Sequence, residues 1–146
     1  MELDEVARTL KSIPLFTNLD VAKLKLLAFA SDRLIFDDQE IIFEAGDAAD
    51  SAYLIESGAA NVYIVEGERR IKVNQLVTND LFGEMALFLK SGRSATIVAS
   101  GTLVAMKLEG DMFLKMVTEN PEAALGVMTA LSEKIVSASE QIVKNS

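Results

Sequence analysis

The first thirty residues place their apolar side chains at helical spacing. Val6, Leu10 and Ile13 follow this period, and Pro14 ends it because the residue before a proline avoids the helical region. A capping signal at residues 17–20 then predicts a second helix. The apolar positions of this second helix are Leu24, Leu27 and Phe29. We expect both helices, within residues 1–30, to pack on the main domain.

From Arg33 onward the pattern changes to short, strand-like apolar runs that are separated by glycines. Runs at intervals of roughly 8–12 residues with glycine turns are typical of a barrel or a jelly-roll sandwich. In this interpretation Ser57-Gly58 and Ser100-Gly101 each divide one strand from the next. The predicted strands are residues 34–36, 40–43, 52–55, 60–65, 71–77, 95–99 and 103–108. We therefore predict a β-roll, a jelly-roll-like barrel, over residues 31–109.

Helical spacing returns after Gly110, first over residues 111–117 and then from Pro121, a favoured first residue of a helix. The second segment carries an apolar seam with the alternating 4,3 spacing of a heptad: Ala124, Met128, Leu131, Ile135, Ala138 and Ile142. The seam fits a parallel homodimer through residues 121–143, or a helix that packs on its own barrel. The whole pattern predicts one α+β domain over residues 1–146, with C-terminal helices over 110–146.

Composition narrows the chemistry that this domain can perform. The 146 residues contain no cysteine and no histidine, which removes thiolate chemistry, disulfides and the commonest metal ligand. The net charge of -8, without a basic stripe, disfavours nucleic-acid binding. The acidic N-terminus is not a secretory signal, and no apolar run approaches the roughly 20 residues of a membrane span. We expect a cytoplasmic protein that binds neither nucleic acid nor membrane.

One acid and one base, Glu84 and Arg93, stand out in the otherwise apolar, small or hydroxylated stretch 81–99. A phosphodiester in a partly buried site needs a cation and several hydrogen-bond donors. Arg93 offers a guanidinium that stays charged and grips two oxygens, and Ser94 adds a hydroxyl. Gly83 lets the backbone approach a ligand closely. These residues predict a site for a small phosphorylated sugar.

The stretch 81–99 also contains further hydrogen-bonding groups for such a ligand. If a helical turn begins after Gly83, the backbone N–H groups of residues 85–87 add donors. Glu84 accepts hydrogen bonds when ionised, so it suits a sugar hydroxyl and can distinguish ribose from deoxyribose. Neither charged residue is placed as a catalyst, and no spare base stands beside Glu84. We therefore do not expect an enzyme, and we expect no cofactor.

Two sequence motifs resemble those of a known protein family. Phe82-Gly83-Glu84-Met85-Ala86-Leu87 and, nine residues after the glutamate, Arg93-Ser94-Ala95-Thr96 resemble the phosphate-binding cassette of cyclic nucleotide-binding domains. The cassette would span residues 82–96. Similarity extends through residues 42–47 and 53–58 to the long helix at 120–140, which resembles that of catabolite activator-type regulators. The resemblance implies a ligand sensor whose C-terminal helix moves over the bound nucleotide.

By this resemblance, Glu84 would bind the ribose 2′-hydroxyl, and Arg93 with Ser94 the cyclic phosphate. Gly83 and the backbone of Met85 and Ala86 would line the same cavity. The further implied ligand-binding residues are Phe82 in the motif, Val73 and Ala95 beside the base, and Ser139 on the adenine. The implied ligand is cAMP in preference to cGMP.

Two residues depart from the family pattern. Gly92 stands where proline is frequent, which loosens the loop before Arg93, and Ala138 replaces a frequent threonine, which removes one polar contact to the base. We expect no DNA-binding module, and hence an unknown downstream protein partner. Two alternatives stay open. The first is a dimeric scaffold or protein-interaction module that keeps the fold without a ligand, and the second is a surface pair formed by Glu84 and Arg93.

Overall fold

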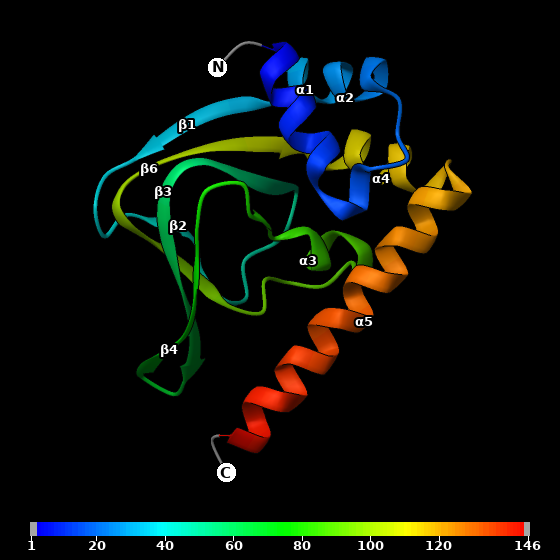
Figure 1. Ribbon diagram of the computed structural model, residues 1–146. Coiled ribbons are helices and arrows are strands. Elements are labelled where there is room, and N and C mark those ends of the chain that lie inside the picture. Colours follow the sequence, from blue (N-terminus) through cyan, green and yellow to red (C-terminus); the bar gives the residue numbers. More distant parts are fainter. Residues whose placement is uncertain (1–2, 145–146) are drawn as a thin grey trace. The chain divides into compact units, whose positions relative to one another are not determined.

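The computed structural model describes residues 3–144, apart from the side chains of residue 14 and of residues 123, 130, 134–135 and 137–144. The chain divides into two compact units, Leu26–Leu114 and Met1–Lys25 together with Lys115–Ser146 (Figure 1). Helices α2 (Val21–Phe29) and α4 (Gly110–Thr118) each cross from one unit to the other. The predicted domain boundaries stay predictions.

The first unit contains the antiparallel sheet, in which hydrogen-bonded neighbours follow the order β1-β6-β3-β4. The two short strands are attached to this path, because β2 pairs with β6 and β5 pairs with β3. The strands are β1 (Asp32–Phe36), β2 (Ile41–Phe43), β3 (Ser51–Glu66), β4 (Arg69–Leu76), β5 (Leu81–Phe82) and β6 (Thr96–Glu109). The predicted α+β class and the β-roll are confirmed, but the sheet is not a closed barrel: β1 and β4 lie at its edges.

Two long strands replace four predicted ones. We expected breaks at Ser57-Gly58 and at Ser100-Gly101, whereas β3 and β6 each run through the glycine. The register of β3 against β6 shifts on both sides of Ser57, which marks an irregularity within a continuous ladder. Gly58 (φ +96°) lies so close to the partner strand that a Cβ there would be 2.4 Å from the Thr102 carbonyl oxygen. Glycine therefore permits a bend and a close approach here, where the sequence pattern suggested a turn.

A cluster of buried apolar side chains joins the long strands to the cassette. Its members are Tyr53, Ile55, Ala60, Phe82, Ile97, Ala99, Leu103 and Ala105. Partly buried hydrophobic residues pack against it: Leu34, Phe36, Ile42, Phe43, Val62 and Leu76. Because Phe82 belongs to this cluster, the start of the cassette is fixed to the core of the sheet.

The second unit is helical, with α1 (Leu3–Ser12), the 3-10 helix η1 (Pro14–Phe16) and α5 (Pro121–Lys144). Helix η1 contacts both α1 and α5. Val6 and Leu10, one helical turn apart, are fully buried, as their spacing predicts. Helix α5 begins at Pro121 as predicted, and the Asn120 side-chain oxygen accepts a hydrogen bond from the Glu122 N–H at 3.0 Å.

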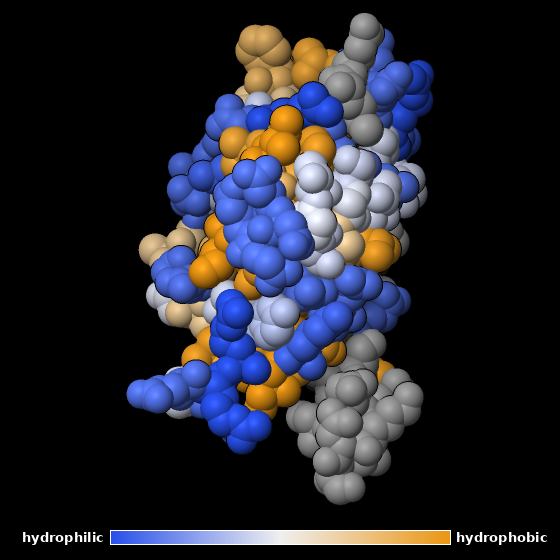
Figure 2. All heavy atoms as spheres, turned by 90° about the vertical axis from the view of Figure 1, so that its left-hand side faces the viewer, coloured by the Kyte–Doolittle hydropathy of each residue, from blue (hydrophilic) through white to orange (hydrophobic). Residues whose placement is uncertain are grey.

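The surface carries both polar and apolar residues. On the face in Figure 2, hydrophilic residues in blue are interspersed with hydrophobic residues in orange. Among residues 3–144, no helix combines the length and apolarity needed to cross a membrane. Nor do the described side chains include a group of three acidic, histidine or cysteine residues that could hold a metal ion.

Replacement of Gly58 tests the close approach of β3 to β6. Gly58→Ala should lower the free energy of unfolding by about 3 kcal/mol, because the positive φ and the clash with Thr102 add. Gly67→Ala is the matched control, since Gly67 also has a positive φ (+62°) but nothing lies within 4 Å of its Cβ position. The control should lose only about 1 kcal/mol in urea unfolding. Equal losses in the two variants would contradict the close approach.

Candidate functional site

The first half of the cassette leads into a short helix, and the second half follows the end of that helix. Strand β5 ends at Phe82, Gly83 adopts the left-handed conformation (φ +81°), and α3 (Glu84–Leu89) follows at once. The helical turn predicted after Gly83 is therefore confirmed. Lys90, also left-handed at φ +51°, ends α3 and sends the chain back toward β6. Glycine suits the first position because an L side chain there would be strained.

Arg93 is the centre of this arrangement. Its side chain is buried, with 5% of the residue exposed. One terminal nitrogen donates to the Gly83 carbonyl at 2.6 Å and the other to the Ser51 carbonyl at 2.7 Å. The Arg93 backbone is held as well: its N–H donates to Asp47 O at 2.8 Å and its carbonyl accepts from Gly46 N at 2.7 Å. The two halves of the predicted motif thus meet directly through Arg93 and Gly83.

The guanidinium of Arg93 lies over the ring of Phe43, with 4.1 Å from Cζ to the ring centroid. Burial lowers the pKa of this guanidinium, and the nearby carboxylates of Asp50 and Asp47 only partly oppose that shift. The guanidinium nevertheless stays charged at neutral pH, because arginine is not deprotonated in proteins. The salt bridges among the described residues are Lys25–Asp4 and Arg33–Glu56, so Arg93 takes part in none of them. Its Nε, also buried, has no hydrogen-bond partner in the described part of the chain. The site therefore holds a buried cation whose charge no directly paired carboxylate balances.

Glu84 occupies the first turn of α3 and is also buried, at 6% exposure. Burial of both Glu84 and Arg93 contradicts the alternative of a pair on a surface loop. Ser94, by contrast, is exposed beside Arg93. An inward cation and acid next to an accessible hydroxyl could bind an anion that also bears hydroxyl groups.

Comparison with known proteins identifies the family of this chain. The sequence model described as "Cyclic nucleotide-binding domain" matches residues 33–120. The chain belongs to this family.

Curated relatives of this cyclic nucleotide-binding domain include regulatory subunits of cAMP-dependent protein kinase. One from Mucor circinelloides is 34% identical over 107 residues, covering 73% of this chain and 25% of its own. The type II subunit of Drosophila melanogaster is 33% identical over 97 residues, covering 66% of this chain and 26% of its own. The chain thus spans about a quarter of the length of these relatives.

Solved structures agree on the fold. The sensor domain of the transcriptional regulator DNR from Pseudomonas aeruginosa superposes with a TM-score of 0.84 at 23% identity, covering 96% of this chain and 95% of that one. The regulatory domain of Toxoplasma gondii PKA, crystallised with cAMP, gives a TM-score of 0.77 at 25% identity. That match covers 89% of this chain and 50% of the other.

The other predicted site residues of the domain lie on several elements. Val73 is on β4, with 36% of its surface exposed, and Ala95 is partly buried just before β6. Within the cassette, Phe82 and Ala86 are buried and Met85 is partly buried. Ser139 belongs to α5, but its side chain is outside the described part of the structure, as is that of Ala138. The roles predicted for these residues stay predictions.

The predicted base contact, Val73, lies at a bulge in the pairing of β3 with β4. Val62 pairs with Asn74 and Tyr63 pairs with Lys72, so Val73 is the extra residue between them. Directly paired residues share a face of a sheet, so Asn74 lies on the same face as Val62, which packs against the core. The position of Asn74 on this face could not be predicted from the sequence, because simple alternation does not reveal a bulge.

The groups that hold Arg93 could not be recognised from the sequence. Phe43 reads as an ordinary strand residue, and the carbonyls of Gly83 and Ser51 are backbone atoms with no signature in the sequence. The β2–β6 pairing, with Phe43 opposite Ile97, was needed to locate the ring near Arg93.

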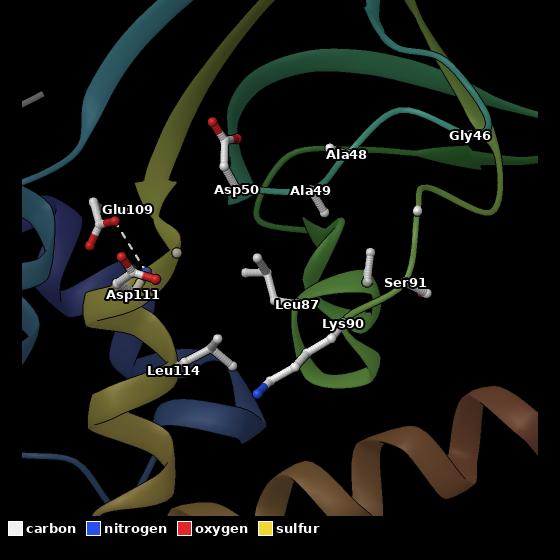
Figure 3. Close-up of a pocket in the computed structure, with 13 residues that line it drawn as sticks. Gly46, Ala48, Ala49, Asp50, Leu87, Lys90, Ser91, Glu109, Asp111 and Leu114 are labelled. Carbon is white, nitrogen blue, oxygen red and sulfur yellow. Dashed lines mark hydrogen bonds between the residues drawn. The ribbon is translucent and has the colours of Figure 1, made fainter.

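A pocket of about 670 Å³ lies on another side of the cassette helix (Figure 3). Its lining includes Leu87, Lys90, Asp50 and Glu109, but neither Glu84 nor Arg93. The Glu109 carboxylate already has a structural role, because it accepts hydrogen bonds from the N–H groups of Asp111 (3.1 Å) and Met112 (2.7 Å) at the start of α4. The pocket thus shares Ala86 with the predicted cyclic nucleotide site but contains neither of its charged residues.

Gly83→Ala should disturb the anion site directly. A Cβ at Gly83 would lie 2.8 Å from an Arg93 terminal nitrogen and 3.4 Å from a Phe43 ring carbon. The guanidinium would have to move, and we expect cAMP affinity in calorimetry to fall about tenfold or more. Gly101→Ala is the control, because Gly101 has a similar positive φ (+73°) but nothing lies within 4 Å of its Cβ position. The prediction is wrong if the two variants bind equally well.

Proposed function

We propose that this chain is a sensor module that binds a cyclic purine nucleotide, cAMP in preference to cGMP. The observation that carries the proposal is the buried guanidinium of Arg93, which has a free Nε and no directly paired carboxylate among the described residues. A buried charge is costly unless it is compensated, and a cyclic phosphate carries the single negative charge that would compensate it. Family membership and the kinase regulatory subunits among its relatives support the same ligand class.

Within this proposal the cassette residues have separate tasks. Arg93 and Ser94 bind the cyclic phosphate, and the backbone of Gly83, Met85 and Ala86 lines the phosphate side. Glu84 accepts a hydrogen bond from the ribose 2′-hydroxyl, which a buried carboxylate at the start of α3 suits. These are binding roles, and the proposed function is not catalytic.

Helix α5 is proposed as both lid and dimerisation helix. A nucleotide that binds one position of α5 more tightly than the other would shift the equilibrium between them. On this helix Leu125 (60%), Met128 (58%) and Val136 (56%) are exposed apolar residues. Met128 belongs to the heptad seam, which supports a parallel homodimer. An unknown downstream protein would then detect the change.

Calorimetric titration tests the proposed ligand. The chain should bind cAMP more tightly than cGMP, and cAMP more tightly than 2′-deoxy-cAMP. Glu84→Ala should weaken cAMP binding by about 1.5–3 kcal/mol, the usual contribution of a hydrogen bond to a charged group, and should remove the preference over the deoxy analogue. Glu68→Ala, at an exposed acidic residue, should change neither property.

Absence of heat with both cyclic nucleotides would reject the sensor and favour the alternative of a ligand-free scaffold. A Glu84→Ala variant that still prefers the ribose form would reject only the role of Glu84.

The dimer is tested separately by placing a charge on the seam of α5. Met128→Asp should raise the dimer dissociation constant about tenfold or more in analytical ultracentrifugation, because a carboxylate would be buried between apolar residues. Thr129→Asp adds the same charge at an adjacent exposed position outside the seam and should leave association unchanged. Equal effects would indicate that this face of α5 is not the interface.

A further inference from the structure

The ring of Phe43 forms one wall of the environment of Arg93. The two residues are fifty positions apart in the chain, and the pairing of β2 with β6 brings them together. The Arg93 Cζ lies 4.1 Å from the ring centroid, within the range of a strong cation–π contact. Such a contact gains strength when water is excluded, and Arg93 is only 5% exposed.

The Phe43 ring is itself held by two other aromatic residues. Its centroid is 5.9 Å from that of Tyr53 and 6.0 Å from that of Phe82, and both rings are tilted against it. Tyr53 and Phe82 stack on each other at 5.2 Å. Since Tyr53 and Phe82 are both buried in the core cluster, the position of the Phe43 ring is fixed by the core of the sheet.

The guanidinium is thus constrained in two directions. In the plane of the guanidinium, the two terminal nitrogens donate hydrogen bonds to the carbonyls of Gly83 and Ser51. Across its face, the ring of Phe43 limits movement and its negative π-surface stabilises the cation. The Nε–H is a buried donor that has no partner among the described residues.

We propose that Phe43 is a positioning residue, whose ring holds the Arg93 guanidinium ready for the cyclic phosphate and stabilises its charge while the site is empty. This inference rests on the proposed function, in which Arg93 binds the phosphate. An aliphatic side chain at position 43 would fill similar space but offer no π-surface. The guanidinium would then lose the contact on its face and bind the phosphate less well.

The experiment compares Phe43→Leu with Phe36→Leu. Phe36 is the matched control, because it is another partly buried phenylalanine that packs against the same core cluster. In calorimetry, Phe43→Leu should weaken cAMP binding about tenfold, whereas Phe36→Leu should change it less than about threefold. Equal affinities of the two variants for cAMP would overturn the role of Phe43.

Proton NMR provides a second measurement that needs no nucleotide. In the wild-type chain, the Arg93 Nε–H signal, identified by its loss in Arg93→Lys, should be shifted upfield by the Phe43 ring and should exchange slowly with water. Phe43→Leu should remove the upfield shift, and Phe36→Leu should keep it. An unshifted signal in the wild-type chain would overturn the inference.

The two measurements separate this inference from the proposed function. A wild-type chain that shows the ring shift but binds neither cyclic nucleotide would reject the proposed function, and with it the phosphate-positioning role, while confirming the contact between Phe43 and Arg93. A wild-type chain that binds cAMP, with a Phe43→Leu variant that binds as tightly as Phe36→Leu, would reject only the role of Phe43.

Discussion

The burial of one positive charge organises this domain. A guanidinium removed from water must be compensated by hydrogen bonds, by polarisable groups or by an anion. Here two backbone carbonyls and the Phe43 ring supply part of that compensation to Arg93. The carbonyls belong to Gly83, before α3, and to Ser51, at the start of β3, so the charge connects the cassette to the sheet. Among the described residues no directly paired carboxylate completes this compensation, which supports the proposal that an anion binds here.

Glycine determines how closely the parts of the sheet and the cassette approach. At Gly58 the missing side chain lets β3 pass within contact of the Thr102 carbonyl, so two long strands can bend without a break. At Gly83 it leaves room for the guanidinium and the Phe43 ring. In both places a positive φ and a close neighbour exclude other residues together. The fold and the binding site therefore depend on the same physical property.

Sequence patterns predicted the α+β class, the strand-rich middle, the helix from Pro121 and the helical turn after Gly83. They failed where the decisive feature is not a side-chain pattern. Alternation could not distinguish a bend at Gly58 from a turn, nor reveal the bulge that brings Asn74 opposite Val62. Phe43 was missed because a ring acquires its function only when strand pairing places it beside a charge fifty residues away. The motif located Arg93 in the sequence, but only the three-dimensional structure identifies the carbonyls and the ring that hold it.

The acceptors that hold Arg93 are main-chain oxygens, and this affects how the site can vary. Replacing the side chain of Ser51 leaves its carbonyl in place, so the hydrogen bond at 2.7 Å can persist through many substitutions at that position. Because Ser51 is only 1% exposed, related chains could carry another small side chain at residue 51 and still hold their arginine in the same way. Alanine scanning at residue 51 would therefore not detect this acceptor, although it helps to orient the Arg93 charge.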